Sequence, residues 1–176
     1  MNSELYTKIA NSTAHRASRD ENAEHILANI YLLPDLLEIA LHVGDKNHHK
    51  ACWILELVLE KDLFLLEKYL DVFCNSMSKY TNQSAMRSIS KISMFLSQNG
   101  TLTPFQEQKI TENCLDWIIN DTTKTATKAY AIRSLYALST KNHSILVDLK
   151  RILIDDYPKN SSAYRAVARE ILKKIK

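Results

Sequence analysis

Glycine and proline are scarce in this 176-residue chain, which contains only two glycines and three prolines. A β-rich protein needs many turn residues, and a flexible linker between domains needs glycine or proline, so neither is predicted. No GxGxxG or GxxxxGK(S/T) motif is present to bind a dinucleotide or a phosphate. The composition therefore predicts an all-α protein whose helices are joined by short connections.

Long apolar runs and a disulfide framework are missing as well. No segment approaches the roughly 18 apolar residues of a membrane span, and the N-terminal sequence lacks the apolar stretch of a signal peptide. Cys52, Cys74 and Cys114 are odd in number and lie in apolar stretches, which favours buried thiols in a reducing compartment. We therefore expect a cytoplasmic protein that does not associate with membranes.

The most apolar part of the chain is Lys50–Leu59, with the sequence KACWILELVL. If this segment is helical, only Lys50 and Glu56 require water, so it should be surrounded by other helices at the centre of the fold. We expect Glu56 on a narrow exposed strip that faces a groove. The alternative is a buried Glu56, whose carboxylate would then be perturbed and mark a candidate site.

Apolar periodicity and capping residues predict about ten helices. In the first half of the chain we expect a helix over residues 3–10, a capping box of Ser18 and Glu21, Pro34 in a first turn, and Gly44 as a left-handed C-cap. Asp45 should cap the helix that ends near Lys61, and Asp62 should cap a helix to about Met77. In the second half we expect helices over 82–98 and 143–156, a capping box of Thr103 and Gln106, Asp121 or Thr123 as the cap of a helix to about Ser139, and Ser161 at the start of the last helix. The short connections favour alternating antiparallel helices in one domain, residues 1–176.

Alternate helices contain an internal repeat. Aligned on Ala51, Ala85, Ala129 and Ala163 as their first core alanines, they recur at intervals of 34, 44 and 34 residues, close to the roughly 40-residue unit of paired-helix repeats. Small residues let stacked helices approach each other closely. The chain resembles a HEAT or armadillo-like right-handed α-solenoid over approximately residues 20–176. The resemblance implies a concave surface lined by the alternate helices.

A narrower resemblance is carried by four stretches: KACWILELV, CLDWIIND, KAYAIRSLYAL and YPKNSSAYRAVAREILKKI. They resemble a family of short uncharacterised bacterial proteins that often carry the automatic label adenylosuccinate lyase. That enzyme is much longer, and its family uses a catalytic loop with a Ser-Ser-x-Met-Pro-x-Lys pattern. None of the three prolines here follows a methionine. No catalytic residue of the lyase is therefore carried over, and a lyase remains a distant alternative.

Other chemistry-bearing residues do not form a recognised catalytic or metal motif. His48 or His49 with Cys52 would place two metal ligands on one helical face, near His42, but no CxxC or HExxH accompanies them. We expect a solvated helix N-terminus beside a buried thiol. No GxSxG elbow is present either. The prediction is a non-enzymatic protein with no catalytic residue, metal or cofactor.

The charge distribution gives the main functional signal. Residues 1–80 contain 8 basic and 12 acidic residues, whereas residues 81–176 contain 15 and 8. Several cations recur four residues apart on the alternate helices, and tyrosines lie among them, which is typical of a surface that binds an anion or stacks on a base. The predicted groove residues are Glu56, Arg87, Lys91, Lys128, Tyr130, Arg133, Tyr136, Arg165 and Arg169. The alternative is an ordinary solvated surface with uneven charge.

Two functional hypotheses follow. The first is a protein-interaction or scaffold module that holds a protein or peptide partner in the concave groove. The second is nucleic-acid binding through the basic second half, because bacterial DNA-alkylation-repair glycosylases also use HEAT-like helical pairs with basic concave surfaces. Phosphate contacts would make that binding strongly salt-dependent.

Overall fold

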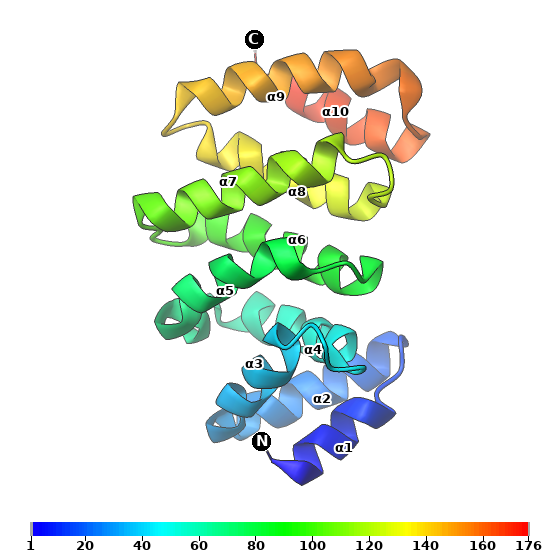
Figure 1. The fold of residues 1–176 in the computed structure, drawn as a ribbon, viewed down its shortest axis with the longest axis vertical. Helices are drawn as coiled ribbons and strands as arrows, with labels where there is room; N and C mark the ends of the chain where they lie inside the picture. The colour runs from blue at the N-terminus through cyan, green and yellow to red at the C-terminus, as the bar shows by residue number, and fades with distance from the viewer. Residues whose placement is uncertain (1, 176) are drawn as a thin grey trace. The chain divides into compact units, whose positions relative to one another are not determined.

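The computed structural model describes residues 2–175, which form ten α-helices, four 3-10 helices and no strand (Figure 1). The all-α prediction is therefore confirmed. The chain divides into two compact units, the first ending at Ile89 and the second beginning at Ser90. The helix α6 (Gln83–Asn99) starts in the first unit and ends in the second. The prediction of one domain over residues 1–176 stays a prediction.

The first unit is built around α4 (His48–Lys61), which contains the apolar segment singled out in the sequence. Both α2 (Arg16–Ala28) and α3 (Leu33–Leu41) pack against it. Ile54, Leu55 and Val58 are fully buried, and burial of each such side chain contributes roughly 1.5–3 kcal/mol. The remaining elements of this unit are α1 (Ser3–Asn11), η1 (Ile30–Leu32), η2 (Leu63–Tyr69), α5 (Leu70–Ser76), η3 (Met77–Lys79) and the start of α6.

The second unit is organised around α8 (Thr125–Leu138). Three helices pack on it: α7 (Pro104–Ile119), α9 (His143–Asp156) and α10 (Ser162–Lys174). A short 3-10 helix, η4 (Tyr157–Lys159), connects the last two. Ala131, Ile132 and Leu135 of α8 are fully buried, so this face of the helix forms the core and the opposite face remains for other contacts.

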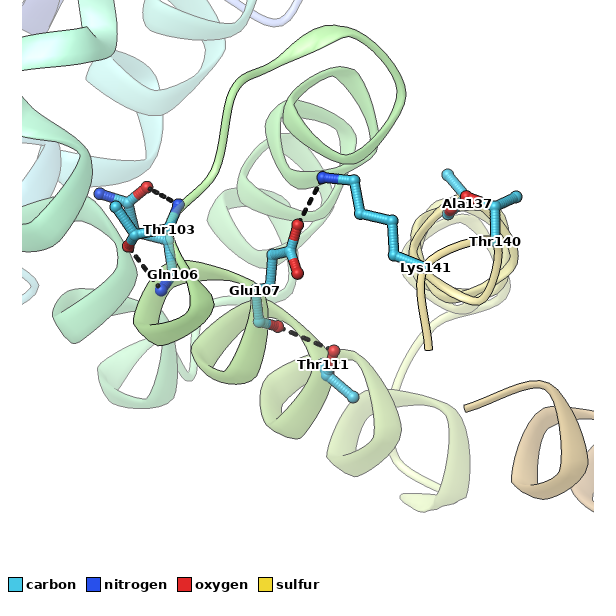
Figure 2. Close-up of polar contacts among 7 residues, drawn as sticks. All are labelled: Thr103, Gln106, Glu107, Thr111, Ala137, Thr140 and Lys141. Carbon is cyan, nitrogen blue, oxygen red and sulfur yellow. Dashed lines mark hydrogen bonds and ion pairs between the residues drawn. The ribbon is translucent and has the colours of Figure 1, made fainter. Parts of the chain in front are cut away.

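Two of the predicted helix starts are confirmed in atomic detail. Thr103 and Gln106 form the capping box shown in Figure 2: the Gln106 amide donates to Thr103 Oγ1 (3.3 Å), and the Thr103 amide donates to Gln106 Oε1 (3.0 Å). Ser161 caps α10, because its Oγ accepts a hydrogen bond from the Tyr164 amide (3.3 Å). Each cap satisfies a backbone donor that the helix itself leaves unpaired.

Two other capping predictions are wrong. The helix expected to start at Ser18 begins at Arg16, and Ser18 Oγ instead accepts from the amide of Thr13 (3.1 Å). Gly44 was expected to adopt a left-handed conformation, but no residue within the described range has a positive φ. The turn after α3 therefore needs no special freedom of glycine.

The caps of two further helices are displaced by one to three residues. The N-cap of α4 is Asn47 rather than Asp45. Asp45 lies two residues earlier, in the turn before the helix, where its Oδ1 accepts a hydrogen bond from the Asn47 amide (2.7 Å). The N-cap of α8 is Lys124, which makes no side-chain cap, rather than Asp121 or Thr123. In both cases an oxygen-bearing side chain stands in the preceding turn, which sequence reasoning does not separate from the cap position.

The segment expected as one helix over residues 62–77 is divided into η2 and α5. Asp62 does cap it, since Oδ1 accepts from the Phe64 amide (3.0 Å). Leu63 and Leu66 are three residues apart, a spacing that aligns side chains along one edge of a 3-10 helix. The cap at Asp62 was therefore predicted correctly, but the single helix was not.

The alanine alignment of the repeat is wrong in the second unit. The first two aligned alanines are fully buried, whereas Ala129 is half-buried and Ala163 is exposed. The fully buried alanines of α8 and α10 are Ala131 and Ala168. The described helices pack on their neighbours and remain compatible with a helical repeat. In α8 and α10, however, the repeat has to be aligned on the buried alanines and not on the predicted ones.

Candidate functional site

A groove in the second unit surrounds the C-terminal ends of α8 and α10. It consists of two adjoining depressions of about 450 Å³ and about 420 Å³, which share Tyr136, Thr140 and Lys174. We call their combined lining the α8–α10 groove. Its lining residues are Ser97, Gln98, Gly100, Arg133, Tyr136, Ala137, Ser139, Thr140, Lys141, His143, Leu146, Val147, Lys150, Glu170, Ile171, Lys174 and Ile175. Each depression falls within the usual size of a ligand pocket.

The periodicity of α8 determines which of its side chains reach the groove. Arg133 and Tyr136 are three residues apart on α8 and therefore share one face, and Thr140 lies two residues beyond the end of the helix. The other face carries the buried Leu135 and Leu138 and is held in the core. The packing of α8 thus fixes the position of Arg133 and Tyr136 on the groove side.

The centre of the groove is an ion-pair network with one carboxylate and two cations. Arg133 Nη2 lies 2.9 Å from Glu170 Oε2, and Lys174 Nζ lies 3.1 Å from Glu170 Oε1. The hydrogen bond from Lys174, followed by the one from Arg133, lowers the pKa of Glu170. The side chains of Arg133, Glu170 and Lys174 are 31%, 41% and 50% exposed, respectively. Water and salt therefore screen this network.

Tyr136 adds an aromatic surface to the same place. The Nζ of Lys174 lies 5.8 Å from the centre of the Tyr136 ring, within the range of a cation–π contact. Ile171, which is buried, and Val147, which is 58% exposed, supply aliphatic surface. The groove therefore offers apolar, aromatic and charged surface together, the combination found in binding sites for peptides and small molecules.

The turn after α8 is anchored to α7 by a further ion pair. Figure 2 shows Lys141 extending from the end of α8 towards α7, where its Nζ lies 2.6 Å from Glu107 Oε1. Thr140 Oγ1 donates to the carbonyl of Ala137 (2.8 Å) and Thr111 Oγ1 to the carbonyl of Glu107 (2.8 Å). These contacts hold the rim of the groove where Thr140 and Lys141 line it.

Positive charge predominates in the groove. Its lining contains four cationic side chains, Arg133, Lys141, Lys150 and Lys174, and one carboxylate, Glu170. One sign of charge gathered in a depression raises the local concentration of ligands with the opposite sign. The electrostatics of the groove therefore favour an anionic partner.

In the first unit, the structure brings together two of the predicted site residues, Glu56 and Arg87. Glu56 was expected on an exposed strip, but it is only 1% exposed, and that expectation is wrong. Arg87 Nη1 lies 2.7 Å from Glu56 Oε2, and Ser88 Oγ donates to the same oxygen (2.6 Å). Because α6 supplies these donors to α4, the helix can bury its carboxylate and needs no exposed strip.

The other predicted site residues are dispersed. Lys128 is only 3% exposed, with its Nζ 6.0 Å from the ring centre of Tyr164, so it does not line an open groove. The Nζ of the half-buried Lys91 lies 5.2 Å from the ring centre of Phe95. Tyr130 is half-buried, whereas Arg165 and Arg169 are exposed. Of the nine predicted residues, the α8–α10 groove unites only Arg133 and Tyr136.

Sequence reasoning did not assign Lys141, Lys150, Glu170 and Lys174 to the groove. A usable signal existed for Glu170: it lies 37 positions after Arg133, just as Arg87 lies 31 positions after Glu56. Both intervals are close to the repeat interval, so an acidic and a basic residue about one repeat apart mark a contact between alternate helices. Lys141 and Lys150 carried no such signal.

The three cysteines are buried and unpaired with one another in the described part of the chain. Burial raises the pKa of the thiols of Cys52, Cys74 and Cys114 to about 12, which makes them poor nucleophiles. Cys52 Sγ donates to the carbonyl of Ala40 (3.5 Å). Within residues 2–175, no group of three or more His, Cys, Asp or Glu side chains is arranged to hold a metal ion. None of the described helices is long and apolar enough to cross a bilayer.

Comparison with protein-family models, curated proteins and solved structures found no match to this chain.

Proposed function

We propose that this chain is a non-enzymatic protein-interaction module that binds a peptide segment of a partner protein in the α8–α10 groove. The observation that carries the proposal is the groove itself: two adjoining depressions with an aromatic ring, aliphatic walls and charged side chains. Apolar anchors surrounded by polar groups are typical of surfaces that recognise peptides. The proposal includes the HEAT-like solenoid as the repeat type, and a reducing, cytoplasmic location, which the three free buried cysteines support.

Peptide selection tests this proposal. A library of random dodecapeptides is displayed on phage and selected against the immobilised protein, and enriched peptides are then measured by fluorescence anisotropy. The informative variant is Val147→Asp, which places a charge on the apolar wall of the groove. We expect it to weaken binding at least about tenfold, as loss of an interface anchor does.

Ile154→Asp is the matched control, because Ile154 is also exposed on α9 (53%, against 58% for Val147) but lies outside both depressions. It should bind the selected peptides as the unaltered protein does. Failure to enrich any peptide, or equal loss of affinity in both variants, would rule out the groove as a peptide site.

Nucleic-acid binding is the second candidate, and one surface feature favours it. Arg165, Arg169 and Lys173 are all exposed and recur every four residues along α10, so they form a basic stripe. Binding through this stripe should weaken steeply between about 50 and 200 mM salt. Anisotropy with labelled single-stranded and duplex DNA measures it, comparing Arg169→Gln with Arg151→Gln on α9. Absence of binding at low salt excludes this function.

A further inference from the structure

We propose that Arg133 and Lys174 form a subsite for an acidic side chain of the partner, and that Glu170 occupies this subsite as an internal competitor. The inference rests on the proposed peptide-binding function, to which it adds the chemistry of the ligand and a means of control. It starts from the Glu170 carboxylate, whose two oxygens are bound by different cations at 2.9 Å and 3.1 Å. A carboxylate from another chain can make the same two contacts.

Exposure distinguishes this network from a purely structural ion pair. The Glu170 side chain is 41% exposed, whereas that of Glu56, which pairs with Arg87 in the first unit, is 2% exposed. Exposed ion pairs contribute little to stability because water and salt screen them, so exchanging one carboxylate for another at Arg133 costs little. The buried Glu56 carboxylate has no comparable access to solvent, so its pair with Arg87 does not exchange as readily.

The surroundings of the subsite define what else the ligand carries. The Tyr136 ring lies beside Lys174, and the second depression continues along Leu146 and Val147 to Lys150. A segment that combines acidic with large apolar residues complements this lining in both charge and polarity. With Glu170 in place, the groove already contains one negative charge, which lowers its affinity for such a segment.

Two acetylated hexapeptides test the inference: Glu-Glu-Phe-Glu-Glu-Leu and its neutral counterpart Gln-Gln-Phe-Gln-Gln-Leu. Their affinities for the full chain are measured by isothermal titration calorimetry at low salt. Glu170→Gln removes the competing charge while preserving the size of the side chain, and Arg133→Gln removes half of the subsite. Circular dichroism verifies that each variant is folded.

The matched controls are Glu112→Gln and Arg151→Gln. Glu112 is 48% exposed and pairs with Lys109, and Arg151 is 71% exposed and pairs with Asp148. Both pairs are solvent-exposed, as the subsite is, but contribute no residue to the groove. Any effect of charge removal as such should therefore appear in these controls as well.

We expect the acidic peptide to bind about three- to fivefold more tightly to Glu170→Gln and about three- to fivefold more weakly to Arg133→Gln, with the controls unchanged. Equal binding of both peptides to the unaltered protein overturns the subsite but leaves peptide binding intact. Unchanged or weaker acidic-peptide binding in Glu170→Gln overturns the role of Glu170. Failure of both peptides in every variant overturns the inference, and the proposed function also falls if the library yields no binder.

A last arm uses oligothymidylate. Suppose that neither peptide binds, whereas the oligonucleotide binds and gains affinity in Glu170→Gln. The Arg133–Lys174 pair then binds a nucleic-acid phosphate instead of a carboxylate. That result overturns the assignment to an acidic protein segment.

Discussion

Removing the hydroxyl of Tyr164 should stabilise the second unit, even though the side chain is fully buried. Tyr164 is 0% exposed, and its hydroxyl has no hydrogen-bond partner among the described residues. Burying an unpaired hydroxyl costs roughly 1–3 kcal/mol. Burial also raises the pKa of the Tyr164 phenol, so the group stays neutral across the accessible pH range. Tyr164→Phe removes this cost and retains the ring.

The expected gain is about 1 kcal/mol, because repacking around the missing oxygen offsets part of the benefit. For a chain of this length, it corresponds to a rise in Tm of about 2–4 °C. The contact between Lys128 Nζ and the Tyr164 ring, at 6.0 Å, survives the change, since phenylalanine presents the same aromatic face. The gain therefore reports on the hydroxyl alone.

Tyr80→Phe is the matched comparison, because it deletes the same atom from a residue of similar burial. Tyr80 is 4% exposed, and its hydroxyl donates to the carbonyl of Ala40 at 2.8 Å. Its removal should destabilise the protein by about 1 kcal/mol. Cys52 Sγ, at 3.5 Å from the same carbonyl, keeps that acceptor from being wholly unpaired.

Urea unfolding followed by circular dichroism measures both variants, with thermal unfolding as a second readout. The reasoning requires shifts of opposite sign for two chemically identical substitutions. If Tyr164→Phe lowers the free energy of unfolding as Tyr80→Phe does, the Tyr164 hydroxyl is hydrogen-bonded and the account of its environment is wrong.

Three further predictions concern charge and thiols. Arg87→Met should destabilise the protein by about 3 kcal/mol in urea, because it removes a cation that pairs with the buried Glu56 carboxylate. Arg16→Met breaks an exposed pair and should change stability far less, so equal effects of the two substitutions would contradict this. The pKa of Glu170 is lowered in the folded state, so its ion pairs stabilise the protein above about pH 4.3, and this stabilisation is lost as the pH falls further. The free energy of unfolding, measured from pH 6 to 3, should therefore fall slightly less in Glu170→Gln than in the unaltered protein. The buried cysteine thiols, with pKa values of about 12, should react with a disulfide reagent at about pH 8 only after unfolding, and rapid labelling of the native protein would show that their burial is incomplete.

Local chemistry explains which helix starts were predictable from the sequence. The capping boxes and caps at Thr103 and Ser161 were readable because donor and acceptor lie within three residues of each other. Ser18 carries the same type of side chain, but its oxygen bonds to an amide before the helix. A hydroxyl can satisfy either neighbour, and the sequence does not say which one the tertiary structure leaves available.

Long-range partners explain which site residues were not predictable. Glu56 was placed on an exposed strip because a lone carboxylate in an apolar helix normally needs water. Its actual donors, Arg87 and Ser88, lie on another helix more than 30 positions away. Lys128 was misplaced for the complementary reason: a lysine is normally exposed, but this one is buried, with its Nζ 6.0 Å from the ring centre of Tyr164. Charge alone does not distinguish these environments.

In each unit a carboxylate–guanidinium pair joins alternate helices, and the order of the charges is reversed between the two pairs. In the first unit the acid precedes the base, Glu56 with Arg87, whereas in the second the base precedes the acid, Arg133 with Glu170. The same chemistry thus occurs at two levels of burial. A buried pair fixes the register of two helices, because any change leaves a charge in the core, whereas an exposed pair can exchange partners at little cost. Position relative to solvent, more than residue identity, therefore makes the first pair structural and gives the second the freedom that the proposed subsite requires.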